Sequence, residues 1–330
     1  MTEAVPRWRD GRSSWADVVR VLEETLVRES KRGVHYSGYW RKHLRQFDLR
    51  SSGVSMGIDR GAFPDLIARP RHASRLRDRA YIALDRAVRG RPRSRRTTQR
   101  GCPSSIQIAA WSEKRAIDDG LMHHSYILEL LATFDLLGVG LACVIGDGMT
   151  NFLRPALEEF SPATRFLSIN LREGHLIDAR LMATAEGVPP VEMLRSRAAV
   201  NSWLESEGTA RVGLVLAEDV DVLRGVGIDL FVNVASMQEM TPEAIRLYFD
   251  LMRSAPGSVF YCCNREEKSI KDGAVSRFAE YPWEEAEVLL DERCPWLSRY
   301  VSRRRRRIVR SLPTRHRLVR FPVEPRRVLG

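Results

Sequence analysis

The stretch CVIGDGMTNFL, residues 143–153, joins an apolar run to a glycine-containing turn and then to a segment of helical character. Glycine at the carboxyl end of a strand permits a tight turn and lets a ligand approach the backbone closely. The first turn of a following helix offers free N–H groups. The stretch therefore predicts a cofactor-binding turn at Gly146, Asp147, Gly148 and Asn151, although a plain turn between a strand and a helix would show the same pattern.

The pattern around this turn is that of an α/β protein. From residue 138 onward, short apolar runs alternate with helical ones, which is typical of a parallel sheet covered by helices. The expected strands are 141–145, 166–170, 212–216, 228–234 and 258–262, with a last edge strand at 316–321. We therefore expect residues 138–330 to form a Rossmann-like, doubly wound and mostly parallel sheet, followed by an arginine-rich C-terminal segment.

The ends of several helices are also marked in the sequence. Thr241 as a cap and Pro242 in the first helical position predict the start of one helix, and Pro256-Gly257 predicts its end. Residues 1–137 are expected to form a helical region that covers the sheet. Its helices are predicted over 14–29, with Ser14 as the cap, and over 121–137. Between them, the segment 86–100 is interpreted as a linker or a flexible insertion.

Polar residues follow the second and third strands, where a doubly wound sheet binds its ligands. Asn170 ends the second strand and is placed to reach a ribose hydroxyl, with Glu173 as the alternative acceptor. Glu218 and Asp219 follow the third strand and are placed to meet an adenine amino group. A solvated loop carboxylate is an equal alternative for each of these acids.

Further polar residues follow the fourth and fifth strands, whose ends are expected to meet in one crevice. The expected cofactor contacts there are Asn233 and Ser236, and the expected substrate contacts are Gln238, Asn264, Arg265 and Glu266. Two adjacent strand ends that converge are stronger evidence for a site than either alone, although strand ends are polar in any protein.

Two residues are candidates for a general base. Glu239 is the first, because the apolar neighbours Met237 and Met240 would make its carboxylate more basic. His175 is the second, because it follows the second strand near the expected crevice and histidine titrates near neutrality. A structural role is the alternative for His175. Glu239 with Asn264 could also hold a divalent cation through oxygen ligands, as could Glu239 with Glu266, although the sequence defines no coordination sphere and we predict no metal site.

The composition restricts the class of protein. The chain has 330 residues, and 53 Lys+Arg against 42 Asp+Glu give a formal net charge of +11. No apolar run is long enough to span a bilayer, and the first residues lack the apolar segment of a signal peptide, so we expect a cytoplasmic protein. The five cysteines include no C-x-x-C pair, which indicates neither a disulfide framework nor a structural zinc site.

The positive charge is concentrated in two segments. Residues 86–100 hold seven arginines and no acid, and residues 293–330 hold thirteen arginines against the single Glu324. The run Arg303 to Arg307 is suited to a phosphate-bearing substrate or a membrane surface, because guanidinium groups match phosphate geometry. A solvated face or a disordered tail is the alternative. No motif indicates specific nucleic-acid binding, and the sequence does not define an oligomeric state.

Six segments, in order along the chain, carry a family resemblance. They are HYSGYWRKHL at 35–44, VNVASMQEM at 232–240, FYCCNREEK at 260–268, RFAEYPW at 277–283, DERCPW at 291–296 and HRLV at 316–319. In these segments the chain resembles the sugar O-methyltransferase family. The resemblance implies a class I methyltransferase of Rossmann-like fold that uses S-adenosylmethionine. Its acceptor would be the hydroxyl of a nucleotide-linked or lipid-linked sugar, or of a glycan intermediate, in carbohydrate biosynthesis.

The sequence departs from the class I pattern, and two alternatives stay open. Val144 and Asn170 stand where acidic residues are usual, and Thr150 stands where a third glycine is often found. The missing acids favour a cofactor-free binding or scaffold protein with a degenerate Rossmann site. An NAD(P)-dependent sugar oxidoreductase is disfavoured, because the turn lacks the full G-x-G-x-x-G and no Tyr-x-x-x-Lys pair follows a strand.

Overall fold

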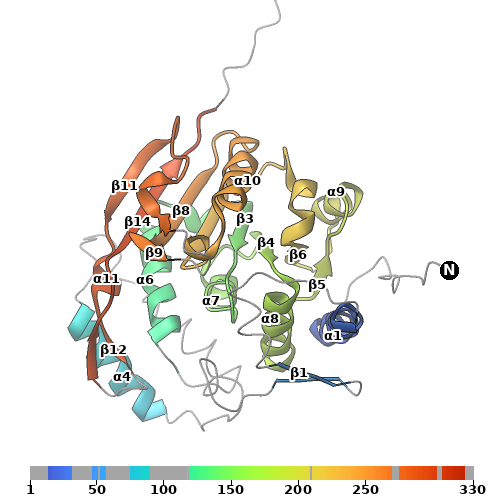
Figure 1. Ribbon diagram of the computed structural model, residues 1–330, viewed down its shortest axis with the longest axis horizontal. Coiled ribbons are helices and arrows are strands. Elements are labelled where there is room, and N and C mark those ends of the chain that lie inside the picture. Colours follow the sequence, from blue (N-terminus) through green and yellow to red (C-terminus); the bar gives the residue numbers. More distant parts are fainter. Residues whose placement is uncertain are drawn as a thin grey trace, which may run out of the picture.

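Eight strands form one sheet at the centre of the computed structural model (Figure 1). They are β3 (Leu141–Ile145), β4 (Arg165–Asn170), β5 (Val191–Met193), β6 (Val212–Leu216), β7 (Leu230–Val234), β8 (Val259–Arg265), β11 (Glu287–Arg293) and β14 (Thr314–Arg320). Their order across the sheet is β11-β14-β8-β7-β3-β4-β6-β5. The structure describes residues 14–31, 47–50, 53–56, 75–89, 117, 119–208, 210–269, 275–302 and 307–323.

The sheet is doubly wound and mostly parallel, as predicted. The five expected strands correspond to β3, β4, β6, β7 and β8, and all of their pairings with one another are parallel. In the order of their appearance these strands lie 3-2-1-4-5 across the sheet, which is the first part of the doubly wound order. The winding therefore reverses between β3 and β7, and the turn that begins at Gly146 lies at this switch point.

The prediction of an edge strand at 316–321 is wrong in its position. β14 covers this segment, but it lies between β8 and β11 and pairs antiparallel with both. Its residues His316, Leu318 and Val319 are buried, as expected for a strand with a neighbour on each side. The actual edges are β11 and the three-residue strand β5. The sequence pattern indicated neither strand, because β11 mixes four charged residues with three apolar ones without alternation, and β5 is too short to show a period.

Helices cover both faces of the sheet. They are α1 (Trp15–Lys31), α4 (Arg75–Arg89), α6 (Asp119–Thr133), α7 (Leu153–Glu159), α8 (Arg172–Thr184), α9 (Arg197–Glu205), α10 (Pro242–Arg253) and α11 (Pro295–Ser298). On β3, Ala142 and Val144 face the core that includes residues of α1, α4, α6, α7 and α8, whereas Cys143 and Ile145 face the core that includes α9 and α10. The strand alternation thus divides the interior into two apolar layers.

The predicted helix ends are largely confirmed. Ser14 Oγ accepts a hydrogen bond from Asp17 N at 3.2 Å, and Thr241 Oγ1 accepts one from Ala244 N at 3.3 Å. The helix predicted over 121–137 is shorter, because α6 ends at Thr133 and Asp135 takes a left-handed conformation (φ 57°). A separate 3₁₀ turn, η1 (Leu136–Gly138), follows it.

The first helices pack directly on the rest of the chain. α1 lies beside α8 (Figure 1), and Trp15 Nε1 donates to the Pro189 carbonyl at 2.9 Å. α4 packs against the hairpin of β12 (Arg299–Ser302) and β13 (Arg307–Arg310), where Tyr81 Oη donates to the Val301 carbonyl at 2.9 Å. The division of the chain at residues 137 and 138 stays a prediction.

The two arginine-rich segments are described only in part. α4 continues through Arg89, so the first four residues of the predicted linker at 86–100 are helical, and the remainder lies outside the described residues. In the run Arg303 to Arg307, only Arg307 is described, as the first residue of β13. No helix among the described residues is long and apolar enough to cross a membrane.

Smaller elements complete the fold. They are the hairpin of β1 (Phe47–Arg50) and β2 (Gly53–Met56), the pair β9 (Glu267–Ser269) and β10 (Val275–Arg277), and the 3₁₀ turns η2 (Ala217–Leu223), η3 (Met237–Glu239) and η4 (Phe278–Glu280). η2 follows β6 and η3 follows β7, so both lie at the carboxyl edge of the sheet.

Candidate functional site

The glycine turn after β3 has the tight geometry that the sequence predicts. Gly146 (φ 66°), Gly148 (φ 54°), Met149 (φ 66°) and Thr150 (φ 52°) all take left-handed conformations. The N–H of Gly146 donates to the Ile169 carbonyl at 2.8 Å and thereby extends the pairing of β3 with β4. The chain therefore turns sharply at the carboxyl end of the central strand.

Close packing against the next strand explains one of these glycines. A Cβ at position 146 would lie 2.4 Å from Ser236 Oγ, whereas a Cβ at position 148 would meet no atom within 4 Å. Ser236 Oγ in turn donates to the Ile145 carbonyl at 3.0 Å. Gly146 thus allows the loop after β7 to lie directly against the end of β3.

The first turn of α7 is already occupied by a side chain of the chain itself. The two carboxylate oxygens of Asp147 accept hydrogen bonds from Phe152 N at 2.8 Å and Leu153 N at 2.7 Å. The expectation of free N–H groups for a ligand is therefore wrong for these two amides, because an acid in the preceding turn caps them. Asn151 donates through Nδ2 to the Gly148 carbonyl at 3.3 Å, within the same turn.

Asp178 of α8 binds the glycine turn through hydrogen bonds. The sequence analysis did not identify Asp178 as a site residue. Its carboxylate accepts from Thr150 N at 3.0 Å and from Asn170 Nδ2 at 3.1 Å. Burial, and then the nearby charge of Asp147, raise the pKa of Asp178 to about 8. The signal was present in the sequence as a single acid between the apolar residues Ile177 and Ala179, a position where an acid must have buried partners.

Asn170 faces Asp178 rather than a ligand. Besides the bond to Asp178, its Oδ1 accepts from Leu171 N at 2.9 Å. Its amide also fills the space beside Gly174, where a Cβ would lie 2.3 Å from Asn170 Oδ1. The prediction of Asn170 as a ribose ligand therefore receives no support from its orientation.

Glu173, the alternative acceptor, has the environment that a ligand-binding carboxylate needs. It lies in the first turn of α8, is 2% exposed, and its Oε1 finds no hydrogen-bond partner among the described residues. Burial raises the pKa of Glu173. A buried carboxylate oxygen without a partner is costly in free energy, so a donor from a bound molecule would satisfy it.

The two acids at the end of β6 lie on η2, and each has an arginine partner. Glu218 forms an ion pair with Arg172, and Asp219 forms one with Arg195 at 3.0 Å. Glu218 is exposed and Asp219 is half-buried. Their predicted contact with an adenine amino group stays a prediction.

The ends of β3, β7 and β8 are joined by one hydrogen-bond network. Asn233 Nδ2 donates to the Ile145 carbonyl at 2.9 Å, and Asn264 Nδ2 donates to Asn233 Oδ1 at 2.8 Å. Asn264 Oδ1 accepts from Gln238 N at 3.1 Å, and Gln238 Oε1 accepts from Arg265 N at 2.8 Å. The structure thus brings these predicted residues together beside the glycine turn, at one edge of the sheet.

The charged residues around this network are paired. Glu239 forms an ion pair with Lys268 of β9, and Glu266 forms a two-oxygen pair with Arg293, at 2.9 and 3.2 Å. Glu239 therefore has a cationic partner instead of the apolar surroundings expected from its neighbours. The oxygen-ligand cation site considered for Glu239 is not assembled, because the carboxylates of Glu239 and Glu266 face different cations.

His175 does not face the site. It is fully buried, and its Nε2 hydrogen-bonds to the Val215 carbonyl at 2.9 Å. Burial lowers the pKa of His175 to about 4. The ring is enclosed between α8 and β6, so the structure corrects the expectation of a general base and supports the structural alternative.

A cavity of about 290 Å³ lies near the network but not at the glycine turn. It opens between the start of α10 and the segment from β10 through η4, and its lining includes Met240, Ile245, Ser276 and Tyr281. Met240 directly follows Glu239, so the cavity is lined by the residue next to the candidate base.

Comparisons with known proteins give fold-level likenesses only. No family model matches this chain, and no curated protein matches it. One similar solved structure is magnesium protoporphyrin IX methyltransferase from Synechocystis with bound SAM, at 10% identity, with 76% of this chain and 92% of that chain covered and a TM-score of 0.38. Others are a methyltransferase from Geobacter sulfurreducens (15% identity, 75% and 96% covered, TM-score 0.37) and a protein from Thermoplasma acidophilum (9%, 68% and 98%, 0.41).

Proposed function

We propose that this chain is an S-adenosylmethionine-dependent methyltransferase that methylates a hydroxyl of a sugar or glycan. The observation that carries the proposal is the hydrogen-bond network of Asn233, Gln238 and Asn264 at the switch point of the sheet. It builds a rigid polar edge directly beside the glycine turn. Ligands of doubly wound sheets bind at this place.

The residues around the turn fit an adenosyl cofactor. Gly148, where an added Cβ would meet no atom within 4 Å, leaves the backbone open to a ligand, and Glu173 has a buried oxygen suited to a ribose hydroxyl. Glu173 thus takes the task that was expected of Asn170, and it restores the acid that the class I pattern lacks at position 170.

The two alternative functions have less support. In a dinucleotide-binding sheet the strand order is 3-2-1-4-5-6, whereas here the sixth place is taken by β14, which runs antiparallel. In the dinucleotide motif G-x-G-x-x-G the third glycine would fall at position 151, which here is Asn151. A cofactor-free scaffold would have no need for a buried carboxylate oxygen that lacks a partner at Glu173.

The chain's own residues would position and deprotonate the acceptor. When bound, the cofactor supplies an electrophilic methyl group on a sulfonium. Glu239, which forms an ion pair with Lys268, would accept the proton of the acceptor hydroxyl. Arg265, at the end of β8, would bind a phosphate of a nucleotide-linked or lipid-linked sugar through its planar guanidinium. Positioning and exclusion of water would supply much of the acceleration.

Calorimetry with S-adenosylmethionine and with NAD tests the cofactor. We expect heat only with S-adenosylmethionine, and binding at least about tenfold weaker for Glu173→Gln, a loss of about 1.4 kcal/mol. Glu205→Gln, at an exposed position of α9, is the matched control and should bind normally. Heat with NAD alone would favour the oxidoreductase, and heat with neither would favour the scaffold.

Methyl transfer from labelled S-adenosylmethionine tests the acceptor. Nucleotide sugars, lipid-linked sugars, a transfer RNA and a porphyrin carboxylate would be offered in parallel. We expect label on the sugars in a form that resists mild alkali, because a methyl ether is stable to base whereas a methyl ester is hydrolysed. Label on the RNA or the porphyrin alone would reject the sugar acceptor and retain the methyltransferase.

A further inference from the structure

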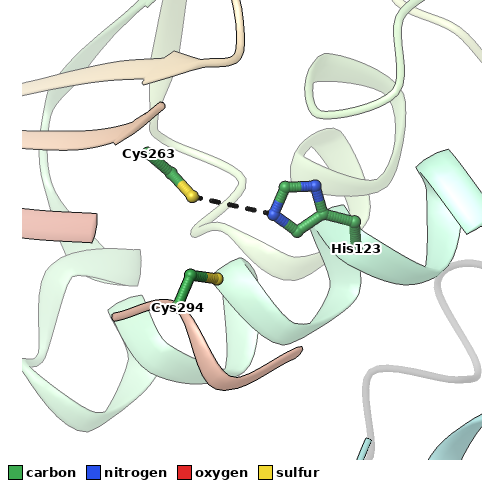
Figure 2. A group of neighbouring side chains, drawn as sticks. All are labelled: His123, Cys263 and Cys294. Atoms are coloured by element: carbon green, nitrogen blue, oxygen red, sulfur yellow. Dashed lines mark hydrogen bonds between the residues drawn. The ribbon is translucent and has the colours of Figure 1, made fainter. Parts of the chain in front are cut away.

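Three side chains that bind metals well converge inside the core that α6 covers. They are His123, Cys263 and Cys294, and their ligand atoms all lie within 4.8 Å of one another. Figure 2 shows Cys263 and His123 pointing toward one another, with the Cys294 sulfur beside them. The Cys263 Sγ to His123 Nε2 distance is 3.8 Å.

Three separate parts of the chain supply these residues. His123 lies on α6, Cys263 lies on β8, and Cys294 directly precedes α11. The strand alternation selects Cys263 over its neighbour, because Cys263 faces the core beneath α6 whereas Cys262 faces the opposite core. Cys294 is held in place by its N–H, which donates to the Thr314 carbonyl at 2.8 Å.

The spacing of the three donors suits a tetrahedral zinc ion. Bonds of about 2.3 Å to sulfur and about 2.0 Å to nitrogen place the ligands of such an ion about 3.5–3.8 Å apart. The observed 3.8 Å between sulfur and nitrogen matches this spacing, and no other pair of donors is separated by more than 4.8 Å, so binding requires an approach of about 1 Å at most. We propose that His123, Cys263 and Cys294 bind one Zn²⁺. This site is separate from the function proposed for the strand ends, which does not require a metal.

An oxygen donor for the fourth position lies beside Cys263. The hydroxyl of Tyr261 contacts the Cys263 side chain and hydrogen-bonds to His316 Nδ1 at 3.2 Å. Tyr261 is fully buried, and it precedes Cys263 by two residues on the same face of β8. The donor set is then two sulfurs, one imidazole nitrogen and one phenol oxygen.

Metal binding would release protons in a defined number. Cys263 and Cys294 are thiols. Zn²⁺ replaces both thiol protons, which pass to the buffer, and the neutral imidazole of His123 keeps its ring proton on Nδ1. With the phenol oxygen protonated, the site has no net charge, as burial requires.

Such an ion would fasten α6 and the turn before α11 to β8. Cys263 directly precedes Asn264, so the ion would hold the strand end that carries the polar network. The role is structural, because the three donors are 0–6% exposed and no substrate reaches them.

Metal analysis of the 330-residue chain tests the proposal. The protein would be purified from zinc-supplemented cells, passed over a chelating resin and measured by plasma mass spectrometry, and we expect about one zinc per chain. Cys263→Ala should lose most of this zinc, whereas Cys262→Ala, the equally buried neighbour on the other face, should retain it. Loss of zinc from both variants, or from neither, would contradict the site.

Two further readouts separate a lost ligand from a damaged fold. Titration of Co²⁺ into the metal-free wild-type chain should produce a sulfur-to-cobalt charge-transfer band and release two protons, and His123→Gln should weaken both. A chelator should lower the melting temperature of the wild type and leave that of Cys263→Ala unchanged. A Cys263–Cys294 disulfide in freshly purified protein, or a cobalt titration without a charge-transfer band, would overturn the proposal.

Discussion

Ser236 Oγ lies only 2.4 Å from the position that a Cβ at residue 146 would take. Ser236 therefore excludes any side chain at position 146, which is at the switch point of the sheet. The contact ties the loop after β7 to the end of β3, because Ser236 Oγ also donates to the Ile145 carbonyl at 3.0 Å. The conformation of the glycine turn and the position of the polar network are therefore coupled.

Gly146→Ala should be more damaging than Gly148→Ala, although both positions have positive φ. The left-handed backbone alone costs about 1–2 kcal/mol for a non-glycine residue. At position 146 the clash with Ser236 should add about 1–3 kcal/mol. Urea unfolding of both variants measures the difference, and Ser236→Gly in the Gly146→Ala background should recover part of it. Equal losses for the two alanine variants would show that the contact with Ser236 is unimportant.

Asp178 should make the protein less stable as pH rises. Its folded pKa of about 8 lies above the unfolded value of 3.8, so the native state binds more protons than the unfolded state between these values. Stability from this group is present below about pH 4 and is lost as pH rises toward 8. Between pH 5 and pH 8 the free energy of unfolding of the wild type should fall by about 1–3 kcal/mol more than that of Asp178→Asn. Urea unfolding at several pH values measures this, and the same pH dependence in both proteins would contradict the prediction.

His175 should act in the opposite direction on the acid side. Its folded pKa of about 4 lies below the unfolded value of 6.5, so the native state binds fewer protons, and stability is lost as pH falls from about 6.5 to 4. His175→Gln keeps a donor for the Val215 carbonyl, and its free energy of unfolding should fall by about 1–3 kcal/mol less than that of the wild type over this range. Chemical denaturation at pH 7 and pH 4.5 measures the two values. An equal decrease in the variant would show that His175 is not the titrating group.

Asn264→Ala should loosen the whole polar edge. It leaves Gln238 N without its partner, at about 1–3 kcal/mol for a buried group, and it removes one of the two donors to Asn233 Oδ1. We expect lower stability and weaker binding of S-adenosylmethionine together. Asn201→Ala, at an exposed position of α9, is the control and should change neither. Normal cofactor binding by a folded Asn264→Ala would separate the network from the cofactor site.

Much of the fold could be predicted from local sequence. The apolar runs at 141–145 and 212–216 became strands with the predicted bounds, and Thr241 with Pro242 began a helix where expected. These features depend on neighbouring residues, whose side-chain period and capping hydrogen bonds are local. The positions of Gly146 and Asn264 at one sheet edge followed as well, because parallel strands end on the same side.

The partners of individual side chains could not be predicted in this way. Asn170 turned toward Asp178, Glu239 met Lys268, and His175 was enclosed in the core. Each of these outcomes depends on how a helix or a neighbouring strand packs. The identity of a residue and of its neighbours along the chain does not contain this information.

The sequence by itself determined the strand and helix pattern, the switch-point glycine turn and the set of polar residues beside it. Only the tertiary structure decided which carboxylates are paired, which one keeps an unsatisfied oxygen, and that His123 meets a cysteine 140 residues away. The physical reason is that periodicity and capping depend on residues close along the chain, whereas charge pairing and donor convergence depend on the burial of segments that the chain connects only over long distances.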